Sequence, residues 1–126
     1  MNNNFVMNIE GTRTTPSVHI EPGKIEIKGR SIPEDSFEFY NPVIHAIQDY
    51  FRSNELKTEM HFQLEYINSG SKKFITNILS SSNEFYKKGK DIIIRWHFDS
   101  DDESMEELGN DLRGMLQVPF HLIEVD

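Results

Sequence analysis

The residues best placed to do chemistry are two serines, Ser69 and Ser71, at a predicted strand-to-helix junction in the stretch Tyr66-Ile67-Asn68-Ser69-Gly70-Ser71-Lys72-Lys73. An alternating strand pattern enters this stretch, and a helical pattern leaves it. Free backbone N–H groups and the positive end of the helix dipole meet at such a corner. They suit a capping serine, a bound anion or a covalently attached phosphate, and the residue types alone leave all three open.

Two neighbouring features favour a negatively charged group at this corner. Gly70 lets the backbone come close to an incoming group. Lys72 and Lys73 fall in the first helical turn, where the dipole disfavours cations unless a negative charge is sometimes present. Helix-start preferences alone favour Ser69 as a simple cap. The spacing therefore predicts either a cap or an anion site, and the cap is the more common use of serine here.

Composition narrows the class of protein. The 126 residues fit one domain, and 37% hydrophobic residues can fill one modest core. A net charge of −8 disfavours a nucleic-acid backbone or an anionic membrane as partner. Without cysteines or closely spaced histidines, we expect no metal and no cofactor. The sequence shows neither a signal-peptide pattern nor a membrane-spanning stretch, so we expect a cytoplasmic protein.

The patterns along the chain predict the element order ββαβαβαβ within one domain of residues 1–126. Residues 1–16 are polar and are expected to be partly irregular. Asn41-Pro42 resembles a helix start, although residues 36–40 could already belong to that helix. The predicted elements are strands 17–21 and 24–30, a helix ending near 52, strand 58–67, a helix from 69 to about 88, a buried strand 92–94 that leads into 95–98, a helix that opens at 100–103, and strand 118–125. The core positions of that last helix are predicted to be Met105, Leu108, Leu112 and Met115.

The strand at 58–67 indicates how the layers are arranged. Its apolar side chains share one face and its polar side chains share the other; the apolar set is Met60, Phe62, Leu64 and Tyr66. A strand covered by helices on both sides should be apolar on both faces. We therefore predict an α/β domain with a mixed five-stranded sheet, helices mainly on one face, right-handed parallel crossovers and an antiparallel N-terminal edge.

The sequence does not assemble a catalytic site. It contains no Gly-rich phosphate loop, nucleophile elbow or evident nucleophile–base pair, so we do not predict an enzyme. Glu34 and Asp35 are adjacent carboxylates, but nothing around them supports a hydrolytic site. Arg95, Trp96 and His97, at the exit of a buried strand, could line a binding surface. The equally weighted alternative places Trp96 in the core and pairs Arg95 with an acid.

The chain resembles the SiaC-type bacterial regulatory phosphoproteins over nearly its whole length. The similarity rests on the order and spacing of several pieces, none of which is diagnostic by itself. These pieces are Gly11-Thr12, Thr15-Pro16, Gly29-Arg30-Ser31-Ile32-Pro33-Glu34-Asp35-Ser36, Tyr66-Ile67-Asn68-Ser69-Gly70-Ser71, Arg95-Trp96-His97-Phe98-Asp99, Glu107-Leu108-Gly109 and Pro119-Phe120. The family resemblance implies a fold similar to the STAS fold of anti-sigma factor antagonists.

The resemblance also implies a non-catalytic binding switch in cyclic-di-GMP and biofilm control. In the family, a hydroxyl after a Tyr-x-Asn element is phosphorylated by a SiaB-like kinase and dephosphorylated by a metal-dependent SiaA-like phosphatase. The unphosphorylated form binds and activates a diguanylate cyclase. The acceptor position falls on Ser69, with Ser71 as the alternative. Partner contacts are expected around it at Tyr66, Asn68, Gly70, Lys72 and Lys73, and on a further surface at Glu34, Arg95, Trp96 and His97.

A different class of function competes with this switch. The chain could be a constitutive scaffold or a small-ligand-binding module in which Ser69 only caps a helix. Acceptance of phosphate from a cognate kinase distinguishes the two classes, because a mere cap is not a kinase substrate.

Overall fold

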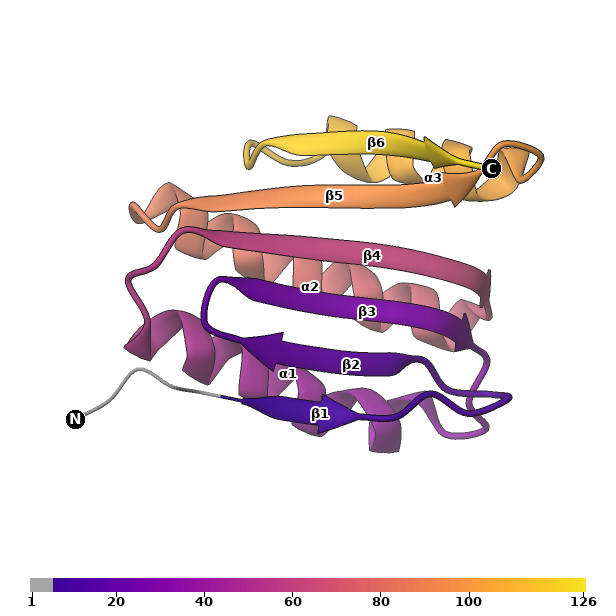
Figure 1. The fold of residues 1–126 in the computed structure, drawn as a ribbon, viewed down its shortest axis with the longest axis horizontal. Helices are drawn as coiled ribbons and strands as arrows, with labels where there is room; N and C mark the ends of the chain where they lie inside the picture. The colour runs from indigo at the N-terminus through magenta and orange to yellow at the C-terminus, as the bar shows by residue number, and fades with distance from the viewer. Residues whose placement is uncertain (1–5) are drawn as a thin grey trace.

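The computed structural model of the protein describes residues 6–126, which form one mixed α/β domain (Figure 1). The nine elements over these residues are β1 (Met7–Ile9), β2 (Ser17–Glu21), β3 (Lys24–Ser31), α1 (Ser36–Ser53), β4 (Thr58–Ile67), α2 (Ser69–Lys87), β5 (Ile92–Asp99), α3 (Glu103–Gly114) and β6 (Phe120–Val125). From β2 onward, this order confirms the order that the sequence predicts. Among the described residues, no helix has the length and apolar character needed to cross a membrane.

The sheet has six strands in the order β1-β2-β3-β4-β5-β6. The β1–β2 and β2–β3 pairs are antiparallel, and the other pairs are parallel. Figure 1 shows α1, α2 and α3 together behind one face of the sheet, as predicted. The prediction of five strands is wrong. The additional strand β1 lies within the supposedly irregular N-terminal stretch, where Met7 and Ile9 pair with β2 and pack against the core.

Helix α1 begins six residues before the proline that resembled its start. Asp35 is the N-cap, and its carboxylate accepts a hydrogen bond from the Glu38 N–H at 3.0 Å. Pro42 therefore lies inside the helix, where it has no N–H to donate. The earlier start brings the N-terminus of α1 to the end of β3, close to the beginning of α2.

The core lies between the sheet and the helices, and Trp96 on β5 is at its centre. Its side chain is 1% exposed and stacks between Phe62 and Phe120, with ring centroids 5.8 and 6.1 Å away. The indole N–H donates to the Met105 carbonyl oxygen at 3.0 Å, which ties β5 to α3. Trp96 is therefore a core residue, and the prediction that it belongs to a partner surface is wrong.

A bulge reverses the side-chain alternation near the end of β4. Gly29 of β3 pairs with Leu64, whereas the next residue, Arg30, pairs with Tyr66. Glu65 is thus an extra residue on β4, and it moves the following side chains to the opposite faces. Tyr66 is 56% exposed instead of facing the helices with Phe62. The expectation of an uninterrupted apolar face through Tyr66 is therefore wrong.

The close approach of α3 to β5 depends on Gly109. A Cβ atom at this position would lie 2.5 Å from Trp96 Cδ1 and 2.6 Å from Leu122 Cδ2. We expect Gly109→Ala to lower the free energy of unfolding by about 1–3 kcal/mol, because the overpacking outweighs the gain in helix propensity. Gly114→Ala is the control, since its added methyl group would meet no atom within 4 Å. Urea unfolding measures both, and equal effects at the two glycines would contradict this packing.

Candidate functional site

The candidate site lies where the parallel strands β3, β4 and β5 end and the three helices begin. Each helix starts with a side-chain cap: Asp35 for α1, Asn68 for α2 and Asp102 for α3. In open α/β sheets, ligands commonly bind outside the carboxyl ends of the strands. The predicted Ser69 corner therefore lies at the edge of the sheet where binding is expected.

Asn68, not Ser69, caps α2. Its side-chain oxygen accepts a hydrogen bond from the Ser71 N–H at 2.9 Å, and its side-chain amide donates to the Pro33 carbonyl oxygen at 3.2 Å. Ser69 is the first residue of the helix and is exposed. The interpretation of Ser69 as a cap is therefore wrong, because the side-chain oxygen of Asn68 caps the helix.

The other candidate hydroxyl, on Ser71, is buried beneath the corner. Ser71 is 0% exposed, and its Oγ has no hydrogen bond of ordinary geometry, although it lies near enough to Tyr40 to influence the phenol. The Tyr40 hydroxyl bonds to the Ser31 hydroxyl. Burial raises the pKa of Tyr40, and these two serines only partly oppose that shift. An incoming group can therefore reach Ser71 only if the start of α2 moves.

Gly70 allows α2 to begin close to α1. A Cβ atom at Gly70 would lie 2.5 Å from the Ser36 Oγ at the start of α1. The sequence predicts that this glycine also lets an incoming group approach the backbone, and this stays a prediction. The contact with Ser36 gives Gly70 a packing role as well, and it helps to keep the exposed Ser69 beside the loop that connects β3 to α1.

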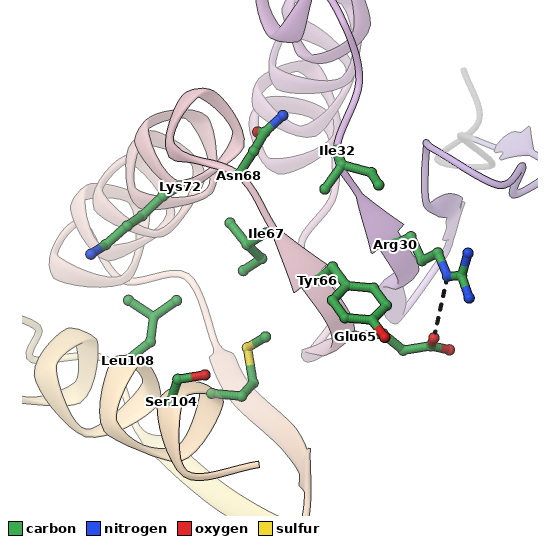
Figure 2. A pocket seen from close by; sticks show the side chains of 10 residues that line it. Arg30, Ile32, Glu65, Tyr66, Ile67, Asn68, Lys72, Ser104 and Leu108 are labelled. Carbon is green, nitrogen blue, oxygen red and sulfur yellow. Dashed lines mark ion pairs between the residues drawn. The ribbon is translucent and has the colours of Figure 1, made fainter.

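A groove of about 750 Å³ lies between the ends of β3 and β4 and the helices α2 and α3 (Figure 2). We call it the α2–α3 groove. Figure 2 shows Ile67 and Leu108 facing each other across its centre and Lys72 extending along one side. The lining residues are Arg30, Ile32, Glu65, Tyr66, Ile67, Asn68, Lys72, Ser104, Met105 and Leu108.

Arg30 and Tyr66 form one wall of this groove. The Arg30 guanidinium lies over the Tyr66 ring, 5.4 Å from its centroid, and its Nε lies 3.7 Å from the Glu65 carboxylate (Figure 2). The β4 bulge creates this arrangement, because it turns Tyr66 to the face that carries Arg30. The wall is therefore an aromatic ring with a partly neutralised cation above it.

The remaining predicted contact residues lie elsewhere. Glu34 is exposed and lines a second hollow with Ile9 and Phe39. Arg95 and His97 lie on the sheet face that the helices leave uncovered, and neither lines the α2–α3 groove. The structure thus groups Tyr66, Asn68 and Lys72 in the groove beside Ser69. Lys73 is exposed on the same helix but does not line the groove.

On the uncovered face, His97 is hydrogen-bonded to His61, with the two ring nitrogens 3.0 Å apart. Arg95 Nε lies 3.3 Å from a Glu59 oxygen, as in the alternative that pairs Arg95 with an acid. The hydrogen bond from His61, together with the nearby charge of Arg95, lowers the pKa of Glu59. Within residues 6–126, no three histidine, aspartate or glutamate side chains gather in a way that could hold a metal ion.

The stability of the protein should depend on pH through His97. Burial, and then the charge of His61, lowers the pKa of His97 below its ordinary value of 6.5. The unfolded chain then binds this proton more readily, so the free energy of unfolding should fall as the pH drops below about 6.5. His97→Gln should flatten this dependence, whereas His121→Gln, an exposed histidine on β6, should not. Urea unfolding between about pH 7.5 and about pH 5.5 measures the slopes, and equal slopes for the wild type and His97→Gln would refute the assignment.

Several groove residues were not recognised as a site from the sequence. Arg30 and Ile32 come from the end of β3 and the following loop, and Leu108 comes from α3, where its spacing predicted a core position. One signal was available in the sequence: Ile32 is an apolar residue in a predicted loop, between Ser31 and Pro33. The structure shows that its side chain is 37% exposed. Only the fold brings these distant segments to one edge of the sheet.

Comparison with known proteins identifies close structural relatives. A sequence model described as "SiaC family regulatory phosphoprotein" matches residues 9–125. An uncharacterised protein of Pseudomonas aeruginosa (strain UCBPP-PA14) is 29% identical over 116 residues, covering 90% of this chain and 92% of that protein.

Two solved structures from Pseudomonas aeruginosa share the fold. One is a chain in the crystal structure of the diguanylate cyclase SiaD in complex with its activator SiaC, with a TM-score of 0.87 and 28% identity over 94% of this chain and 99% of that one. The other is apo-SiaC, with a TM-score of 0.84 and 26% identity over 94% and 98% of the two chains.

Proposed function

The chain belongs to the SiaC family of regulatory phosphoproteins, and we propose that it is a non-catalytic switch that activates a diguanylate cyclase until Ser69 is phosphorylated. A SiaB-like kinase adds the phosphate, and a metal-dependent SiaA-like phosphatase removes it. Ser71 is the less favoured acceptor. The protein acts in the cytoplasm, where these enzymes and their nucleotide substrates meet.

The contrast between the two serines is the observation that carries this proposal. Ser69 is exposed at the first position of α2, whereas Ser71 is fully buried. A kinase must bring the acceptor hydroxyl to a nucleotide phosphate in its own active site, and only an exposed hydroxyl permits this without opening the helix. The positive end of the α2 dipole then stabilises the attached phosphate.

The local charge also supports a phosphate at Ser69. Lys72 and Lys73 follow it at i+3 and i+4, which places them on the same side of the helix. Unlike α1 and α3, α2 has no acidic residue in its first turn. A phosphate adds roughly −1.5 to −2 charge and three acceptor oxygens to a corner with basic neighbours.

The nature of the partner is inferred from the relatives. SiaC of Pseudomonas aeruginosa was solved in complex with the diguanylate cyclase SiaD as its activator, and this chain shares that fold over almost its full length. The α2–α3 groove beside Ser69 supports a binding role. Glu65 is the one carboxylate among its lining residues, and no histidine or cysteine lines it, so the lining does not supply the paired groups of a general acid–base site.

Cyclic-di-GMP synthesis by SiaD tests the proposal. We expect the unmodified protein to raise the rate of synthesis, because its docking surface is free. The protein phosphorylated at Ser69 should raise it much less, and phosphatase treatment should restore the effect. Equal activation by the two forms would argue for a constitutive scaffold instead of a switch.

A further inference from the structure

We propose that the α2–α3 groove receives an acidic segment of the cyclase carrying apolar side chains, and that Lys72 couples phosphate on Ser69 to release of that segment. This inference rests on the proposed function and names the docking surface and the residue that connects it to the switch. It follows from the shape of the groove, its charge and the helical spacing of Ser69 and Lys72.

The groove presents apolar surface that no other described part of the chain covers. Ile67 and Leu108 are only partly buried, and Ile32 and Tyr66 are 37% and 56% exposed. An exposed cluster of large apolar side chains with polar residues around it is typical of an interaction surface. At about 750 Å³, the groove can hold several side chains of a partner segment.

The charge around the groove selects the occupant. The protein has a net charge of −8, but two of the three charged groove residues, Arg30 and Lys72, are basic. Arg30 is partly neutralised by Glu65. In the described part of the chain, the Lys72 ammonium has no ion-pair partner. A carboxylate of the partner would satisfy it, so an acidic and apolar segment fits better than a basic one.

Lys72 belongs to both the groove and the phosphate corner. It lines the groove, and it follows Ser69 by three residues on the same helix. A phosphate on Ser69 would therefore compete with the partner carboxylate for the Lys72 ammonium. The segment would lose its cation and face a new negative charge at the same time. Lys73 follows Ser69 by four residues but does not line the groove, so it is the matched control.

Affinity measurements with SiaD as the binding probe test the groove. For the unmodified protein, we expect Lys72→Ala to weaken binding about tenfold, as expected for one lost charge-assisted contact, and Lys73→Ala to change it less than about twofold. Ile32→Ser should also weaken binding, because it removes apolar surface without changing charge. Met115→Ser, at a residue 58% exposed outside the groove, controls for the loss of an exposed apolar side chain.

Combining Lys72→Ala with phosphorylation tests the coupling. Phosphorylation of Ser69 should weaken binding by a smaller factor in Lys72→Ala than in the wild type or in Lys73→Ala, because the contact it disrupts is already missing. Equal factors in all three proteins would overturn the role of Lys72. Binding that depends on Ser69 phosphorylation but is unaffected by Ile32→Ser and Lys72→Ala would overturn the groove and leave the switch intact. An affinity for SiaD that is the same with and without phosphate on Ser69 would overturn the proposed function itself.

Discussion

Replacing Ser69 with alanine should abolish phosphate uptake while leaving the fold intact. The Asn68 side chain caps α2, and Ser69 is an exposed residue at the first helical position. We therefore expect the free energy of unfolding to change by no more than about 0.5 kcal/mol, the usual range for surface substitutions. Intact mass after incubation with a SiaB-like kinase and ATP should show one phosphate on the wild type and none on Ser69→Ala.

Asn68→Ala is the matched structural control for this experiment. It removes the cap and the hydrogen bond to the Pro33 carbonyl oxygen, so the free energy of unfolding should fall by about 0.5–2 kcal/mol. Thermal or urea unfolding compares the two variants. If Ser69→Ala were the more destabilising of the two, Asn68 would not be the functional cap.

Ser69→Asp should separate charge from acceptor chemistry. The aspartate adds one negative charge at the positive end of the helix dipole, so the protein should fold while its affinity for the cyclase falls. The loss should be smaller than with phosphate, which carries more charge and more acceptor oxygens. Ser69→Ala should bind the cyclase as the unmodified wild type does. Loss of binding in a folded Ser69→Ala protein would mean that the hydroxyl itself contacts the partner.

The largest expected change in stability comes from Phe62→Ala. Phe62 is 1% exposed and packs beside Trp96 in the centre of the core. Truncation leaves a cavity and should lower the free energy of unfolding by about 3–5 kcal/mol. Denaturant unfolding measures this loss of stability from the shift of the midpoint, provided that the m-value of the variant equals that of the wild type.

Tyr66→Ala is the informative comparison, because simple alternation puts Tyr66 on the same face of β4 as Phe62. The bulge at Glu65 turns Tyr66 outward instead, where it is 56% exposed. We expect its truncation to cost less than about 1 kcal/mol, mainly through the lost contact with Arg30. Comparable losses at Phe62 and Tyr66 would show that the alternation continues and that the bulge is absent.

The parts of the fold that depend on side-chain periodicity could be predicted from the sequence. The alternation of Met60, Phe62 and Leu64 indicated a sheet covered on one face, and the structure buries all three. Strands alternating with helices gave the order of the elements from β2 onward. These signals are local, and each depends on neighbouring residues that share one face of an element.

The remaining features depend on contacts that periodicity does not encode. The β4 bulge reverses the alternation at Glu65. Asn68, and not Ser69, caps α2, and its side-chain amide also donates to the carbonyl oxygen of Pro33, which is distant in the sequence. Strand β1 needs only three residues paired with β2, too few for a clear pattern. The α2–α3 groove joins Ile32 and Leu108 from segments that only the folded sheet brings together.

Phosphopeptide mapping of the wild-type protein, after incubation with the kinase and ATP, tests the central claim most directly. Ser69 is exposed and Ser71 is buried. Because the two serines are only two residues apart, the fragmentation must assign the phosphate to a single residue. We predict one phosphate, on Ser69. Phosphate on the buried Ser71, or far from the corner on Ser80, Ser81 or Ser82, would contradict Ser69 as the residue that controls docking.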